Sequence, residues 1–217
     1  MLEFFIAAIV VALAPGPDNL FVLAQSATYG AKAGICIICG LCTGVCIQTS
    51  LLVLGVSALI AASPTAFFVI QCLGAAYLLY LAYKSFQVRA GTVKLDTGGE
   101  SGRVILSEAQ GAKSRDLSLK RLYLRGIIMN LTNPKAILFE LSFIPPAVNM
   151  NSSLSPMLQM AILGAEFIVA TFIVFGSIAF LAGAVKKFML NSPKANRNLN
   201  WFSGCVFVLL AVALFAL

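Results

Sequence analysis

The stretch Ala14-Pro15-Gly16-Pro17-Asp18-Asn19 interrupts an otherwise apolar N-terminal segment. Two prolines and a glycine remove helix hydrogen bonds there, so backbone groups are freed for other partners. Asp18 follows directly, at a place where an unpaired charge is costly. The stretch predicts a broken helix with a polar site at the break.

A second break of the same kind lies in the other half of the chain. The stretch Asn130-Leu131-Thr132-Asn133-Pro134-Lys135 again combines a proline with polar side chains, and its charge is positive. Aligning Pro17 with Pro134 sets Asp18 opposite Lys135. Each buried charge is costly alone, so we expect the two to pair. Breaks at corresponding positions of two halves are typical of transporter binding sites.

The composition is that of a membrane protein. Of the 217 residues, 60% are hydrophobic and 11% are charged, and the mean hydropathy is +0.95. A soluble domain has about 25% charged residues. Backbone in lipid must satisfy its own hydrogen bonds, and long apolar runs without alternation favour helices over a barrel. We therefore predict an all-α integral membrane protein.

Six transmembrane helices are expected. Residues 1–83 hold three of them, residues 84–121 form a polar basic loop, and residues 122–217 hold the other three. Three is an odd number, so related halves would lie in opposite orientations, as an inverted 3+3 repeat with broken helices 1 and 4. The predicted segments run over residues 2–25, 33–62, 65–83, 122–148, 157–185 and 201–217.

The basic residues alternate between the loops. They occur at Lys32, throughout residues 84–121 and in residues 186–200, whereas the other two loops contain none. The positive-inside rule then predicts cytoplasmic basic loops, with both termini outside. This anchoring explains the net charge of +7, so membrane lipids are expected partners of the chain and nucleic acid is not.

The half-helix ends at the two breaks define the candidate site. Free N–H groups suit a carboxylate, and free carbonyls suit a cation. With Asp18 taking a proton or an ammonium group, the cavity would suit a small zwitterion such as an amino acid. A static ion pair joining the halves is the alternative. The candidate residues for substrate or proton binding are Asp18, Asn19, Asn130, Thr132, Asn133, Lys135, Glu140 and Glu166, and the helix-break residues are Pro15, Gly16, Pro17 and Pro134.

Two of these candidates are further acids within predicted membrane segments. Glu140 could reach the cavity as a second proton or ammonium site, or it could lie partly hydrated near the outer surface. Glu166 in the fifth segment is open to the same two interpretations.

A cysteine-rich helix allows a different function. Cys36, Cys39, Cys42 and Cys46 share one segment with Gly40 and Gly44. Such spacing can bind metal or an iron–sulfur cluster, which would suit an exporter of metal cations. Helix packing by small residues is the interpretation we favour, so no metal site is predicted.

Two further function classes follow from the rest of the chain. A non-transporting scaffold could bind a partner or anionic lipid through the loop 84–121. An enzyme or an ATP-driven pump is not expected, because the sequence has no phosphate loop, nucleophile elbow or metal-ligand set. No cofactor is predicted.

Four motifs along the chain form a recognisable combination: Pro15-Gly16-Pro17-Asp18-Asn19, the region from Gly30 to Gly44, Gly74-Ala75-Ala76-Tyr77-Leu78 and Asn133-Pro134-Lys135-Ala136. They resemble the LysE/RhtB family of amino-acid exporters, and the likeness covers essentially the whole chain. The resemblance implies a multi-pass protein of the bacterial inner membrane, an oligomer, that exports amino acids such as homoserine, threonine or lysine by proton antiport. Glu140 and Pro146 depart from the family's pattern, so the substrate is not carried over.

Overall fold

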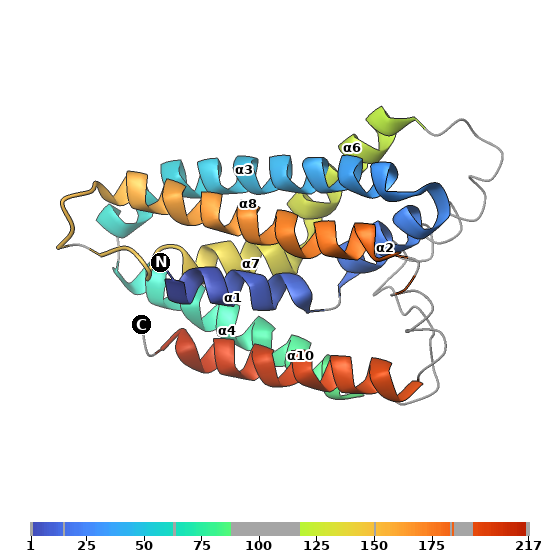
Figure 1. Ribbon diagram of the computed structural model, residues 1–217. Helices are drawn as coiled ribbons and strands as arrows, with labels where there is room; N and C mark the ends of the chain where they lie inside the picture. Colours follow the sequence, from blue (N-terminus) through green and yellow to red (C-terminus); the bar gives the residue numbers. More distant parts are fainter. Residues whose placement is uncertain are drawn as a thin grey trace.

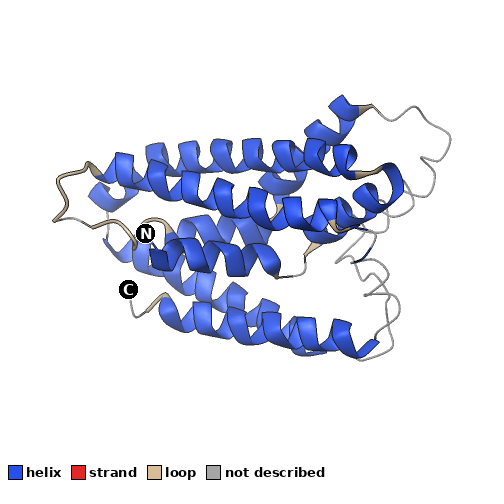
Figure 2. Cartoon of the chain, viewed as in Figure 1, coloured by secondary structure: helices blue, strands red, loops and turns tan. Residues whose placement is uncertain are grey.

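The computed structural model describes residues 2–14, 16–62, 64–87, 118–149, 151–182, 184 and 193–215. In this part of the chain every regular element is an α-helix (Figures 1 and 2). The all-α prediction is therefore confirmed. The helices are α1 (Leu2–Leu13), α2 (Pro17–Tyr29), α3 (Ala31–Ala62), α4 (Pro64–Gln87), α6 (Leu119–Thr132), α7 (Pro134–Phe143), α8 (Pro156–Phe180) and α10 (Pro193–Ala213).

Both predicted helix breaks are present. The first segment consists of α1 and α2, with a bend of 62° between them. The fourth consists of α6 and α7, which meet at Asn133. Pro17 and Pro134 each begin the second helix of their pair. Proline is tolerated there because the first turn leaves its N–H groups unpaired in any case.

Several helix ends differ from the hydropathy pattern. α10 begins at Pro193 rather than Trp201, so residues 193–200, which we expected in a basic loop, are helical. Hydropathy marks the apolar part of a helix and misses polar turns that extend beyond it. α7 ends at Phe143, before the predicted end at residue 148, because Pro145 and Pro146 follow in a turn.

Two ends of neighbouring helices extend into the range expected for the basic loop. α4 continues to Gln87 and α6 begins at Leu119, so both ends of the expected loop 84–121 are helical. Residues 88–117 lie outside the described part of the chain.

Among the described helices, two are long and apolar enough to cross a membrane, or three if a bent pair counts as one span. Ala31–Gly55 of α3 and Pro156–Phe180 of α8 are each long and apolar enough to cross a bilayer, and α1 with α2 makes a third candidate if the bent pair is one span. The apolar part of α10, Asn200–Ala213, is shorter. The six-span inverted repeat thus stays a prediction.

The helices pack as a bundle with α3 and α8 side by side (Figure 1). α6 crosses α3, α1 lies along α8, and α4 lies along α10. One core cluster, which includes Phe139, gathers side chains of α1, α3, α4, α7, α8 and α10. A second, which includes Phe21, gathers side chains of α1, α2, α3, α6 and α8. The described ends of the chain lie at the same end of the bundle, and the turn at Gly30 lies at the other (Figure 1).

Glycines bring α3 and α6 into backbone contact. A Cβ atom on Gly40 would lie 2.1 Å from the Tyr123 carbonyl oxygen, and one on Gly126 would lie 2.3 Å from that of Ile37. A Cβ on Gly44 would meet the Asn130 side chain at 2.7 Å. The predicted packing role of Gly40 and Gly44 is confirmed, and it sets the distance between the broken fourth segment and α3.

We expect Gly40→Ala to destabilise the protein. The added methyl group meets a backbone carbonyl that cannot rotate away, and overpacking of this kind costs about 1–3 kcal/mol. The measurement is the thermal unfolding midpoint of the purified protein in detergent. Gly176→Ala is the matched control, because a Cβ there has nothing within 4 Å. Equal midpoints for the two variants would contradict the close approach of α3 and α6.

Candidate functional site

The first break exposes the carbonyl end of α1. Past Leu13 the chain leaves the helix, Gly16 is extended (φ −148°, ψ 176°), and α2 starts at Pro17. Asn19 turns back from α2, and its Nδ2 donates to the Ala12 carbonyl oxygen at 2.8 Å. A polar side chain of α2 thus satisfies a carbonyl of α1. Pro15, a predicted helix-break residue, lies outside the described residues.

Asn133 has two roles at the second break. Its Oδ1 accepts from the backbone N–H of Lys135 at 3.0 Å and so caps the N-terminus of α7. Its Nδ2 donates to the Asp18 carboxylate of α2. One amide side chain therefore caps α7 and ties the second break to the first.

Lys135 makes the reciprocal connection. Its Nζ donates to the Ala14 carbonyl oxygen at the end of α1, at 3.0 Å. A Cβ atom on Gly16 would lie 3.1 Å from this Nζ, so the glycine leaves room for the ammonium group. Each break thus satisfies a polar group of the other.

The expected direct ion pair is not present. No contact within ion-pair distance joins Asp18 and Lys135, although both residues are described and both are buried. Asn133 binds the carboxylate, and the Ala14 carbonyl binds the ammonium group. Asp18 Oδ1 has no hydrogen-bond partner among the described residues. The two opposite charges are therefore held near each other, and each can still bind a third group.

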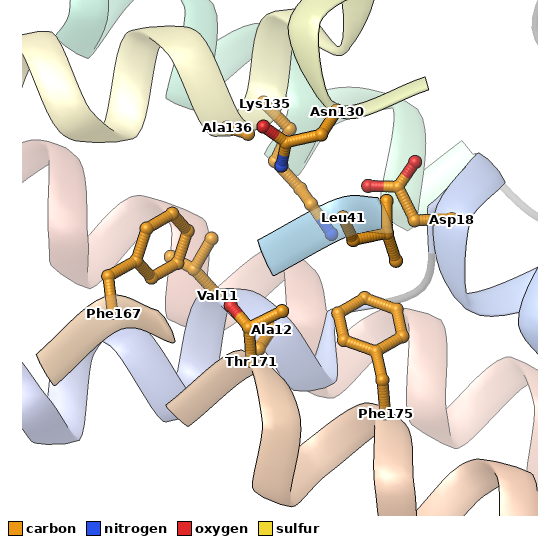
Figure 3. A pocket seen from close by; sticks show the side chains of 10 residues that line it. All are labelled: Val11, Ala12, Asp18, Leu41, Asn130, Lys135, Ala136, Phe167, Thr171 and Phe175. Atoms are coloured by element: carbon orange, nitrogen blue, oxygen red, sulfur yellow. The ribbon is translucent and has the colours of Figure 1, made fainter. Parts of the chain in front are cut away.

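The two charges line a cavity at the junction of six helices (Figure 3). The cavity has a volume of about 20 Å³, which is room for about one water molecule. Asp18, Asn130 and Lys135 form its polar side. Its remaining wall is made by Val11 and Ala12 of α1, Leu41 of α3, Ala136 of α7, and Phe167, Thr171 and Phe175 of α8.

The structure divides the remaining break residues. Asn130 is buried on the cavity, where its Oδ1 has no partner among the described residues. Thr132 is exposed, and its hydroxyl group donates to the Ile128 carbonyl oxygen of its own helix at 2.8 Å. Asn19 and Asn133 support the cavity without lining it. Thr132 therefore lies apart from the other predicted site residues.

The two further acids lie outside this cavity. Glu140 is 1% exposed, and its Oε2 accepts from the Thr49 hydroxyl group of α3 at 2.9 Å. Glu166 is partly buried on α8, with a buried Oε2 that has no partner among the described residues.

Sequence reasoning missed the wall of the cavity that α8 forms from two phenyl rings and a threonine. Phe167, Thr171 and Phe175 recur at a spacing of four along α8, which places them on one face. That spacing is equally typical of helix packing, so no local signal marks these residues as a cavity wall.

The cysteines of α3 serve in packing where their contacts are seen. Cys36 Sγ donates to the Leu119 carbonyl oxygen at 3.0 Å, and Cys42 Sγ reaches that of Ile168 at 4.0 Å. Cys39 and Cys46 are exposed. Within the described residues, no three potential metal-binding side chains are grouped.

The site combines an acid, a base and an unpartnered amide oxygen with an apolar wall. The ammonium and carboxylate groups of a zwitterion can bind Asp18 and Lys135, while the wall accepts an apolar substituent. No phosphate or metal chemistry is required.

Comparisons with known proteins agree with a membrane transport site. The family model described as LysE type translocator matches residues 9–216. The uncharacterized membrane protein YrhP of Bacillus subtilis (strain 168) is 32% identical over 193 residues, which cover 88% of this chain and 87% of that protein.

Efflux proteins are also among the similar sequences. The leucine efflux proteins of Salmonella choleraesuis (strain SC-B67) and Salmonella typhi are each 35% identical over 140 residues. The match covers 64% of this chain and 59% of each of those proteins. No solved structure matches the chain.

We expect Asn133→Ala to lower the thermal unfolding midpoint. It removes the cap of α7, worth about 1 kcal/mol, and a hydrogen bond to a buried charge, worth about 1.5–3 kcal/mol. The matched control is Thr132→Ala, whose exposed hydroxyl group bonds only to carbonyls of its own helix. Substitution of such a surface side chain changes stability by about 0.5 kcal/mol at most. If both variants melt together with the native protein, Asn133 does not hold the two breaks.

Proposed function

We propose that this chain, which belongs to the LysE type translocator family, is a secondary transporter that exports a small amino acid from the cytoplasm in exchange for protons. The observation that carries the proposal is the cavity between two broken helices, with an acid from one break and a base from the other. This arrangement fits a zwitterion and supplies a group that can bind a proton.

Each charged end of the substrate replaces a bond already present. The substrate carboxylate binds the Lys135 ammonium group, which leaves the Ala14 carbonyl. The substrate ammonium group binds the Asp18 carboxylate and the carbonyls freed at the end of α1. Polar groups that are held in place before binding lose little further freedom, which lowers the free-energy cost of binding.

The apolar wall supports a substrate with an aliphatic side chain. Leu41, Phe167 and Phe175 present hydrocarbon surface beside the charges. Among the described residues, no charged group other than Asp18 and Lys135 lines the cavity. A cationic side chain such as that of lysine would be desolvated there without a partner. The leucine efflux proteins that resemble this chain support the same class.

The transport cycle requires the helices to separate. Ligand sites usually have volumes of about 300–1,000 Å³, far above the 20 Å³ seen here. We propose that one half rocks against the other, as expected of an inverted 3+3 repeat of six membrane-spanning helices. The site then opens alternately to the cytoplasm, where the basic loops lie, and to the outside of the bacterial inner membrane, where both termini lie. The assembly we propose is a homo-oligomer.

Protons enter the cycle at Asp18. On the outside, the substrate ammonium group leaves and a proton from the medium binds the carboxylate. On the inside, that proton passes to water when the next substrate ammonium group arrives. The aspartate thus carries a proton inward on each return.

The direct test is amino-acid release by bacteria that express the chain and are loaded with dipeptides. We expect aliphatic amino acids to accumulate outside the cells. Asp18→Asn should abolish this excess, because a neutral amide can bind neither a proton nor the substrate ammonium group as the carboxylate does. Thr132→Ala at equal membrane abundance is the matched control and should export normally. An Asp18→Asn variant that exports like the native chain would overturn the proposed site.

A reversed pH gradient should weaken export. Net release is driven by inward proton flow, so an outside pH above the inside pH opposes it. For one proton per substrate, the equilibrium substrate gradient changes about tenfold per pH unit. The measurement is the steady substrate ratio across proteoliposomes at several external pH values, with protein-free liposomes as the control. A ratio that does not respond to the gradient would contradict proton coupling.

A further inference from the structure

Glu140 lies on the same short helix as Lys135 but contacts different neighbours. α7 holds Lys135 in its first turn, facing the cavity, and Glu140 in its second half, facing α3. The Glu140 carboxyl group contacts Thr49, and Thr49 in turn packs on Gly164 of α8, where a Cβ atom would lie 2.2 Å from Thr49 Cγ2. Glu140 therefore sits where α3, α7 and α8 meet, apart from the cavity lining.

The surroundings of Glu140 are poor in polar partners. Its Oε2 has the Thr49 hydroxyl group, and its Oε1 has no partner among the described residues. None of the described titratable groups on the elements packed around α7 is hydrogen-bonded to Oε1. These groups include Cys42 and Cys46 on α3, Cys72, Tyr77 and Tyr80 on α4, Tyr123 and Arg125 on α6, Glu166 on α8 and Lys135 on α7 itself.

An ionised carboxylate is poorly accommodated in this position. Burying a charge without a cation or a full set of hydrogen bonds costs several kcal/mol, on the order of the values for buried ions. A protonated carboxyl group avoids that cost. The ionised form is accommodated only where water can reach it, and that requires α7 to move away from Thr49.

We propose that Glu140 is a second proton-binding site, separate from the substrate cavity and coupled to it through α7. With α7 packed on α3, Glu140 holds a proton. When the two helices separate, its O–H bond breaks and the proton passes to the entering water. The same movement displaces the helix turn that carries Lys135. This inference rests on the proposed transport function for its role in the cycle, but the proton site itself does not require it.

Infrared spectroscopy tests the proton site without transport. We expect the purified protein in lipid at neutral pH to show the C=O stretch of a buried protonated carboxyl group. The comparison is made in an Asp18→Asn background, so that Asp18 contributes no carboxyl band. Glu140→Gln should remove the band, whereas Glu3→Gln, at an exposed acid in the first turn of α1, is the matched control and should retain it. Absence of any such band, or its survival in Glu140→Gln, would overturn the proposal even if the chain exports amino acids.

Transport assays test the coupling. Proteoliposomes separate substrate exchange, which needs no net proton movement, from net transport driven by a pH gradient. We expect Glu140→Gln to retain exchange and to lose gradient-driven transport by about tenfold, within the range of typical coupling energies. Glu3→Gln, at the exposed acid of α1, should retain both activities. If Glu140→Gln keeps both, or loses both while folded, Glu140 is a packing residue and the proposal is wrong.

A second variant keeps the test decisive if Glu140→Gln fails to fold. Thr49→Val removes the hydrogen bond to Oε2 and leaves the carboxyl group in place. We expect it to shift the external-pH profile of gradient-driven transport without changing the exchange rate. An unchanged profile would count against a proton at Glu140. A native chain with the infrared band but with no exchange would instead refute the transport function and leave the proton site standing.

Discussion

A backbone carbonyl or a charge left unpaired inside an apolar bundle costs several kcal/mol. The two helix breaks avoid this cost because each provides hydrogen-bond partners for polar groups of the other. Lys135 of the second break binds the Ala14 carbonyl of the first, and Asn133 binds Asp18. Neither break is satisfied by its own segment alone. The two halves of the chain are thereby made interdependent at their most polar points.

The rest of the bundle places these breaks against each other. Gly40 and Gly126 allow α3 and α6 to touch through backbone atoms, which holds the second break close to the centre of the bundle. α8 completes the site with the phenyl rings of Phe167 and Phe175. The short helices α2 and α7 thus supply the charged side chains of the cavity, and the long helices α3 and α8 supply most of its apolar wall.

The polar side of the cavity is the part that the sequence could locate, because a proline or a charge in an apolar run is a local signal, and the binding role of these residues stays a prediction. Asp18, Asn130 and Lys135 were found in this way and do line the cavity. It did not predict Leu41 or Phe175, since an apolar side chain facing lipid, a helix or a cavity has the same signature in a chain that is 60% hydrophobic.

Other differences between prediction and structure arise from the direction in which a side chain points from its helix and from the partner that it contacts. Thr132 precedes Asn133 by one residue, a turn of about 100° on a helix, and therefore faces outward. The prediction of a direct ion pair did not consider the Asn133 side chain, whose amide group donates to the Asp18 carboxylate. The direction in which Glu140 points could not be predicted either. Its partner Thr49 lies 91 positions earlier in the chain, and no local sequence pattern links the two residues.

The small volume of the cavity has a consequence for affinity. If the packed conformation dominates, the substrate binds only the fraction of molecules in which the helices have separated, and the measured dissociation constant is the intrinsic one divided by that fraction. A substitution that loosens the bundle would then tighten apparent binding although it touches no ligand. Weak binding by the native chain would reflect a rarely populated open state, and the same rarity would limit leakage of the cytoplasmic amino-acid pool.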